Sequence, residues 1–309
     1  MFYNWTVKDN FWLSTLYGSV SILLAIIILV IIFKNSKTFD SSFFQLYTYD
    51  SILNIFLHFV NWFSMRLSLM ACKDCGLGAF YAGLKHRFLL NFMIAMRYHM
   101  AYVQYSIIAV VSLNRLSVLF DLIFYERHWK RYGFLVFAAI VILPLISTHT
   151  IFFCNPEFKY DATDDIYLLE SDLVVADIYE LLIPFLGGSL LVSLVANIWS
   201  FIIVRSRTTQ SRRRAEINFL VIMSITCIIE LVGTIISYCL YYFATGINSD
   251  LLTNFKLALP YVSDALTLVQ PWLLLFFSHA VREKLFQLLH ITRPVNAVMF
   301  KPSSITHVT

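Results

Sequence analysis

Apolar residues in this chain gather into seven long stretches, which are separated by short segments rich in charged and turn-forming residues. A helix needs roughly 20 mostly apolar residues to cross the hydrocarbon core of a bilayer. Each of the stretches is that long, so each predicts one membrane-spanning helix. The predicted spans lie near residues 13–33, 43–65, 93–119, 132–153, 178–204, 217–243 and 257–278.

The composition agrees with this pattern. Hydrophobic residues make up 59% of the chain and charged residues 14%, against about 25% charged in soluble domains. Gly and Pro are few and strand-like alternation is missing, so helices must satisfy the backbone in lipid. We predict an all-α membrane protein with one seven-transmembrane helix bundle over residues 1–292, including a short amphipathic helix near 279–292, and a tail over 293–309.

The basic residues predict the orientation of the bundle. Most of the 23 Lys and Arg residues fall on one side of the predicted spans, and the positive-inside rule places that side in the cytoplasm. The N-terminus is then outside and the C-terminus inside, although the first outer loop is also basic. On the outer side Asn4, in the sequon Asn4-Trp5-Thr6, would be an acceptor for N-glycosylation.

Three cysteines lie on the predicted outer side, where the environment is oxidising. Cys72 and Cys75 follow the second span, and Cys154 follows the fourth. A bridge from Cys154 to one of that pair would tie the second outer loop to the top of the third helix. A local Cys72–Cys75 bridge and free thiols are the alternatives, and the spacing does not choose among the three.

Polar residues within the spans are costly in lipid and are expected to face the interior of the bundle. Asp50, Asn54 and His58 recur at helical spacing on one face of the second span. Asp264 and Gln270 follow a similar spacing in the seventh. Since Asp50 and Gln270 lie at similar depths, we predict a core polar network of Asp50, Asn54 and Gln270. It would act either as structural glue between helices or in switching.

The third span carries Arg97 and Arg115, which are about five helical turns and roughly 27 Å apart on one face. One arginine marks each membrane boundary. The planar guanidinium of Arg97 would bind a carboxylate or sulfate well, which predicts a small amphipathic ligand with an acidic group. Alternatively, Arg97 snorkels to the headgroups or pairs with an internal carboxylate. The candidate ligand-binding residues are Arg97, His99, Gln104, Glu230 and Asp264.

Three segments carry a family resemblance: SLNRLS at 112–117, SDALTLVQPW at 263–272 and SHAVR at 278–282. Together they resemble the G-protein-coupled receptors, and more narrowly the nematode serpentine chemoreceptors of class gamma, over about residues 10–290. The resemblance implies a chemosensory receptor in the plasma membrane of a sensory cell. Such a receptor binds a small extracellular molecule, activates a heterotrimeric G protein and is not an enzyme.

The same comparison shows departures from the wider rhodopsin-like pattern. Asn114 stands where that group carries an acidic residue before the conserved arginine, and Leu116 stands where it carries an aromatic one. An Asp-Arg lock between neighbours is therefore missing, and another restraint must hold the resting state. The residues expected to couple to the G protein are Asn114, Arg115, Arg212, Arg213 and Arg214.

Other functional classes fit less well, and a transporter or an intramembrane hydrolase is the alternative. An aspartyl protease would need Asp50 and Asp264 at one depth, but they lie in opposite halves of the membrane. A zinc hydrolase would need clustered ligands, and a transporter would favour internal repeats; neither is present in the sequence. The predicted partners are a heterotrimeric G protein, a small-molecule ligand and the lipid bilayer, with no cofactor, metal or nucleic acid.

Overall fold

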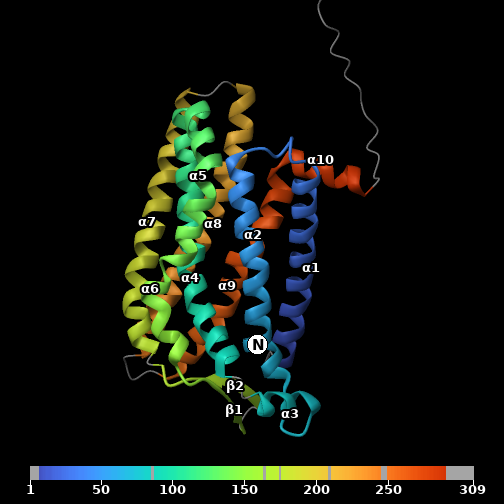
Figure 1. Ribbon diagram of the computed structural model, residues 1–309, viewed down its shortest axis with the longest axis vertical. Helices are drawn as coiled ribbons and strands as arrows, with labels where there is room; N and C mark the ends of the chain where they lie inside the picture. The colour runs from blue at the N-terminus through green and yellow to red at the C-terminus, as the bar shows by residue number, and fades with distance from the viewer. Residues whose placement is uncertain are drawn as a thin grey trace, which may run out of the picture.

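The computed structural model describes residues 7–84, 87–162, 165–173, 175–207, 210–244 and 249–289. Within this part of the chain, long helices lie side by side and form one bundle (Figure 1). These helices are α1 (Val7–Lys34), α2 (Ser42–Asn61), α4 (Arg87–Phe120), α5 (Leu122–Ile142), α7 (Val175–Arg207), α8 (Gln210–Ala244) and α9 (Ser249–Phe277).

Shorter elements cover the two ends of the bundle. One end carries α3 and the β1-β2 pair and is called the hairpin end below; the other carries α10 and is called the α10 end (Figure 1). The short elements are η1 (Trp62–Arg66, a π-helical turn), η2 (Leu67–Met70) and η3 (His149–Phe153), which are 3-10 turns, α3 (Gly76–Gly83), α6 (Leu145–Thr148), β1 (Glu157–Asp161), β2 (Ile166–Glu170) and α10 (His279–Leu288).

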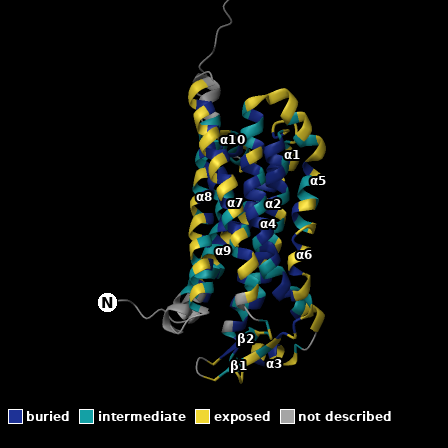
Figure 2. Ribbon diagram, turned by 90° about the vertical axis from the view of Figure 1, so that its left-hand side faces the viewer, coloured by how far each residue is buried: buried dark blue, intermediate teal, exposed yellow. Residues whose placement is uncertain are grey.

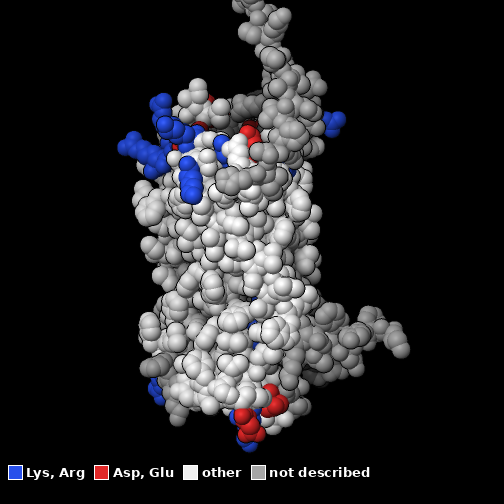
Figure 3. All heavy atoms as spheres, turned by 90° about the vertical axis from the view of Figure 1, so that its right-hand side faces the viewer, with Lys and Arg blue, Asp and Glu red and all other residues white. Residues whose placement is uncertain are grey.

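The helices of the bundle have the surface of a membrane protein. Six helical stretches among the described residues are long and apolar enough to cross a membrane: Phe11–Lys34, Arg87–Phe120, Leu122–Phe153, Asp177–Ser206, Glu216–Phe243 and Ala258–Phe277. On the face in Figure 3, the middle of the bundle shows little charge, and Lys and Arg gather at the α10 end. The predicted all-α membrane protein with several spanning helices is confirmed.

Helix α2 is not among the six stretches, yet it lies in the same bundle and packs against α1, α4, α5 and α9. Its inward face carries Asp50, Asn54 and His58, all buried. Polar residues of this kind lower the hydropathy of a helix and are tolerated where neighbouring helices satisfy them. Both its buried polar face and its apolar residues therefore hold α2 in the bundle.

The core of the bundle follows α4 and α2, whose interior-facing residues are buried along the length of the helices, while exposed residues line the outside (Figure 2). Toward the α10 end, Ile107 and Ile108 of α4 belong to one buried cluster with Phe43 of α2 and Ile222 and Met223 of α8. Close packing of this kind holds α4 in contact with helices on several sides.

The fourth span differs from its predicted range of 132–153. Helix α5 begins at Leu122, because Asp121 caps it by accepting a 3.0 Å hydrogen bond from the Phe124 N–H. It ends at Ile142, before Pro144. Proline has no N–H to continue the helix, and the chain goes on as the short α6 and η3.

The β1-β2 hairpin was not predicted from the sequence, since its segment has the composition of an acidic loop. The two strands pair antiparallel, with Glu157 opposite Glu170. Tyr81 of α3 is buried against Phe158 of β1, with ring centroids 4.6 Å apart, and its hydroxyl donates to the Phe63 carbonyl at 2.9 Å. Helix α3 and the hairpin are thereby attached to η1, at the end of α2.

The contact of α1 with α2 depends on a glycine. A Cβ at Gly18 would lie 2.6 Å from the His58 ring, whereas a Cβ at Gly187 would meet nothing within 4 Å. We predict that Gly18→Ala lowers the free energy of unfolding by about 1–3 kcal/mol through overpacking, and that Gly187→Ala does not lower it. Thermal unfolding of the detergent-solubilised protein measures both, and equal melting temperatures would contradict the described packing.

Candidate functional site

A cavity lies toward the hairpin end between α2, α4, α7, α8 and α9, and together with the open solvent at its mouth it encloses about 910 Å³. Its wall combines apolar residues with the side chains of Tyr98, Tyr105 and Tyr179. The described residues that line it include two arginines, Arg66 and Arg97, and no Lys, Asp or Glu. The cavity wall is therefore largely apolar, and the charged side chains on it are arginines.

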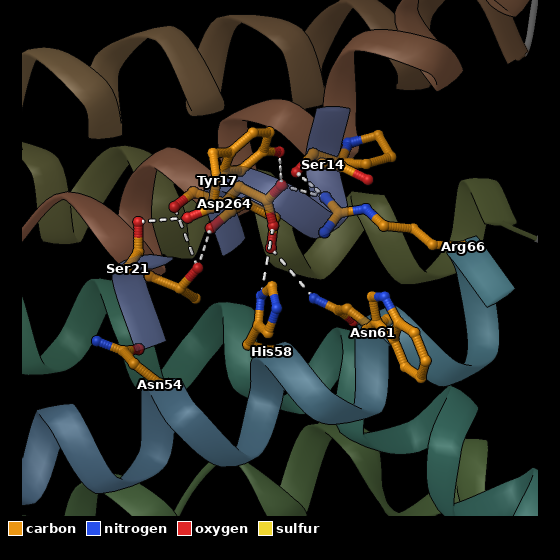
Figure 4. Close-up of polar contacts among 12 residues, drawn as sticks. Ser14, Tyr17, Ser21, Asn54, His58, Asn61, Arg66 and Asp264 are labelled. Carbon is orange, nitrogen blue, oxygen red and sulfur yellow. Dashed lines mark hydrogen bonds and ion pairs between the residues drawn. The ribbon is translucent and has the colours of Figure 1, made fainter. Parts of the chain in front are cut away.

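Arg66 stands in η1, the π-helical turn that continues α2, and is buried there. Its guanidinium pairs with the Asp264 carboxylate of α9, and its Nη2 also lies 3.5 Å from the Pro260 carbonyl oxygen. The Tyr17 hydroxyl of α1 donates to the same carboxylate, and His58 Nδ1 lies 4.0 Å from it (Figure 4). One buried ion pair therefore joins α1, α2 and α9.

The Arg66 guanidinium is not fully used by this pair. Its Nη1 is buried without a hydrogen-bond partner among the described residues, and Arg66 also lines the cavity. A buried donor without a partner is costly. Arg66 therefore retains hydrogen-bonding capacity beside the cavity while its charge is balanced by Asp264.

The five ligand-binding candidates from the sequence separate into two groups. Arg97 and Gln104 of α4 line the cavity, and Gln104 Nε2 donates to Asn54 Oδ1 at 3.1 Å. His99 is buried outside the lining, with its Nδ1 3.1 Å from Thr148 Oγ1 of α6. Its position indicates a contact between α4 and α6.

Asp264 and Glu230 also lie outside the lining. Asp264 points toward Arg66, Tyr17 and His58 (Figure 4). Glu230 of α8 is fully buried, and its carboxyl group lies beside the side chains of Ser193 and Cys227. Neither carboxylate pairs with Arg97, so the internal pairs expected as alternatives for Arg97 are not formed.

The predicted core polar residues are brought together. The Asp50 carboxylate interacts with the side chains of Gln270 and Asn54, and Asn54 accepts the hydrogen bond from Gln104. This network joins α2, α4 and α9 below the cavity. Asp264 has other partners, Tyr17, His58 and Arg66, which lie toward the hairpin end. The two aspartates therefore have separate surroundings, unlike a catalytic dyad.

At the α10 end, Arg115 is held by residues of other helices and not by its neighbours in the sequence. Its Nη1 lies 4.0 Å from Glu216 Oε2 of α8. Its guanidinium carbon also sits 4.1 Å from the ring centroid of Phe43 and 3.9 Å from that of Phe219. Cations are attracted to aromatic faces at such distances. Arg115 therefore links α4 to both α2 and α8.

Asn114 beside it belongs to a second set of contacts. Its Nδ2 donates to Ser42 Oγ at 2.8 Å, and the Ser42 N–H and hydroxyl donate to the Glu126 carboxylate at 2.6 and 2.7 Å. These contacts join α4, α2 and α5. The side chains of Arg212, Arg213 and Arg214, which fall within α8, lie outside the described residues, as does Asn4.

The cysteine candidates lie in two places, and the described sulfurs are free thiols. Cys154 is buried, with its Sγ 2.9 Å from the Ile151 carbonyl oxygen and 3.6 Å from Asn91 Oδ1. Cys72 and Cys75 contact each other, since the Cys72 N–H donates to Cys75 Sγ at 2.8 Å. No group of three or more His, Cys, Asp or Glu residues suited to a metal ion occurs among the described residues.

Sequence reasoning missed Arg66, which the pattern of spans assigns to the first outer loop. Two signals point to it in retrospect. Arg66 follows the polar face of α2 after Asn61, and the seventh span supplies a buried carboxylate in Asp264 that needs a counter-charge. Glu216 and the rings around Arg115 were also missed, because only tertiary structure brings α2 and α8 to that arginine.

A helical membrane bundle with a cavity at one end and a restrained arginine at the other is the architecture of a serpentine receptor. The chain belongs to the Srg family of chemoreceptors, whose family model matches residues 11–285. It is similar to serpentine receptor class gamma-31 of Caenorhabditis elegans, with 24% identity over 278 residues, which are 87% of this chain and 89% of that protein. The resemblance predicted from the three sequence segments is confirmed.

The ion pair at the hairpin end generates a stability prediction. Asp264→Asn leaves the buried Arg66 charge without its counter-ion, so we expect a loss of about 3–5 kcal/mol. The double variant Arg66→Met with Asp264→Leu should recover most of that loss. Asp172→Asn, at an exposed aspartate, is the control and should have little effect. Thermal unfolding measures all of these, and a double variant as unstable as Asp264→Asn would contradict the pairing.

Proposed function

We propose that this protein is a plasma-membrane chemoreceptor that binds a small amphipathic acid in the cavity and activates a heterotrimeric G protein. The proposal rests mainly on the cavity wall. Its described residues include two arginines, Arg66 and Arg97, and no Lys, Asp or Glu. Family membership supports a chemoreceptor of small molecules. The function is signal transduction by binding, without a chemical reaction.

Arg97 is the primary anchor for the acidic group. No described residue forms an ion pair with Arg97, whereas Arg66 is already balanced by Asp264. An entering carboxylate would therefore bind Arg97 as a charge-assisted, two-oxygen pair. The Nη1 of Arg66 would supply a further donor. Tyr98 and the apolar wall would hold the rest of the ligand, since small-molecule sites are lined mainly by hydrophobic and aromatic side chains.

The proposed orientation places the hairpin end outside the cell. Basic residues gather at the α10 end, where α1 ends and α5 begins: Lys34, Lys37, Arg127, Lys130 and Arg131. Cytoplasmic loops are enriched in Lys and Arg. The cavity then faces the exterior, and Arg115 faces the G protein. Because Arg97 and Arg115 stand on the same helix, α4 connects the two ends directly.

Activation requires that the ligand bind one of two conformations more tightly than the other. We propose that the resting conformation is held by Arg115, through its contact with Glu216 and its position between Phe43 and Phe219. Release of these contacts would free the α10 end of α8 from α4 and expose a basic surface. A basic surface suits an acidic partner helix.

The ligand prediction is tested with a panel of small acidic, neutral and basic molecules on cells that express the receptor and a broadly coupling G protein. Arg97→Gln should raise the half-maximal concentration of the active acids roughly 10- to 100-fold, since a hydrogen bond to a charged group contributes about 1.5–3 kcal/mol. Arg87→Gln, at the exposed start of the same helix, is the matched control. Equal potency on Arg97→Gln and the parent receptor would contradict the proposed anchor.

The restraint on Arg115 generates a second prediction in the same assay. Glu216→Gln removes the counter-charge of Arg115 and should raise signalling in the absence of ligand. Glu283→Gln alters an exposed carboxylate of α10 and should leave that basal level unchanged. Surface expression of each variant is measured in parallel. A basal level that falls or stays constant in Glu216→Gln would show that this contact does not hold the resting state.

A further inference from the structure

Cys72 and Cys75 lie in the connection between η2 and α3, outside the helical spans, and both are partly exposed. Cys75 immediately precedes α3 in an extended conformation, which is the N-cap position. Its sulfur accepts a hydrogen bond from the Cys72 N–H at 2.8 Å, and its own S–H donates to the Cys72 carbonyl oxygen at 3.0 Å. The chain therefore turns back so that both thiols meet at the start of a helix.

The surroundings of Cys75 favour its thiolate. The neighbouring Cys72 thiol has the largest effect and lowers the pKa of the Cys75 thiol, and the nearby backbone N–H groups, among them that of Cys72, whose nitrogen lies 2.8 Å from the Cys75 sulfur, lower it further. The contact between the two thiols raises the pKa of the Cys72 thiol. The first-turn N–H groups of a helix are donors without an intrahelical partner, and a thiolate there is nucleophilic. Cys75 is thus the nucleophile of the pair, and Cys72 keeps its own proton.

Gly78 permits this geometry. A Cβ at position 78 would lie 1.9 Å from the Cys72 carbonyl oxygen, which a folded chain cannot accept without moving the backbone, whereas a Cβ at Gly83 would meet nothing within 4 Å. The backbone of Cys72 therefore packs directly on the first turn of α3. A second backbone contact, from the Lys73 N–H to Asp165 Oδ1 at 3.1 Å, holds the same segment beside the hairpin.

We propose that Cys72 and Cys75 form a reversible thiol–disulfide exchange site that reacts with small disulfides at the hairpin end. The Cys75 thiolate attacks one sulfur of a disulfide RSSR, forms a Cys75–S–S–R bond and releases RS⁻. Cys72 then loses its proton to water, and its sulfur attacks the Cys75 sulfur of that bond. A Cys72–Cys75 disulfide forms and a second RS⁻ leaves, so the protein loses two electrons and RSSR gains them.

One hydrogen bond connects the helix that follows the site to the turn that lines the receptor cavity. Helix α3, which begins after Cys75, places Tyr81 so that its hydroxyl donates to the Phe63 carbonyl in η1 at 2.9 Å. The same turn carries Arg66 on the cavity wall. The exchange chemistry itself uses neither the cavity nor Arg115, so it stands or falls separately from the proposed receptor function.

The test uses the full-length protein in detergent, reduced with a small dithiol, desalted and mixed with 4,4′-dithiodipyridine as the small disulfide. Trypsin cleaves after Lys73, between the two cysteines, so a Cys72–Cys75 disulfide keeps the two halves of that segment joined. We expect joined halves and release of both thiopyridone groups in the parent protein. Cys72→Ser should stop at a stable adduct on Cys75, and Cys75→Ser should react roughly tenfold more slowly.

Gly78→Ala tests the geometry with both thiols present. It should slow the reaction roughly tenfold, whereas Gly83→Ala, the same substitution in the same helix, should match the parent protein. First attack on Cys72, a parent protein that stops at the mixed disulfide, or a bridge from Cys154 to either cysteine in the unreduced protein would each overturn the proposal. If Gly78→Ala does not fold, the two serine variants still decide the order of attack.

Discussion

The buried ion pair between Arg66 and Asp264 fixes the hairpin end of the bundle. It draws α9 onto the π-helical end of α2, and the Tyr17 hydroxyl brings α1 to the same carboxylate. Removing two charges from water costs much of what their attraction returns, so the pair specifies one arrangement of helices more than it adds to stability. The close approach of Gly18 to His58 and the position of Arg66 on the cavity wall both depend on that arrangement.

The second organising feature is α4, which carries an arginine at each end. Arg97 faces the cavity, and Arg115 lies between two aromatic rings beside Glu216. Between them Gln104 lines the cavity and contacts Asn54, which belongs to the network with Asp50. A continuous set of polar contacts therefore runs from the cavity into the core. Coupling between the two ends requires that these contacts have two arrangements with different ligand affinities.

The sequence predicts the long helices, because spans of about 20 apolar residues have few alternatives in lipid. It also brings Asp50, Asn54 and Gln270 together through depth and helical spacing. Arg66 is missed because the apolar run ends there, and its burial depends on a carboxylate that is distant in the sequence.

Two other parts of the structure are missed for related reasons. The Arg115 restraint is missed because the chain supplies its partner from α8 and not from the neighbouring position, where Asn114 stands. The β-hairpin is missed because its acidic composition is typical of a solvated loop. The most direct test of the account measures how tightly the strongest acidic ligand binds membranes that carry the parent protein or Glu216→Gln, with no G protein present. Allosteric coupling is reciprocal, so loss of a contact at the α10 end should tighten binding at Arg97 by roughly 5-fold or more, although Glu216 does not line the cavity. Equal affinity of the two proteins, with Glu216→Gln raising basal signalling, would contradict the claim that the cavity and Arg115 belong to one switch.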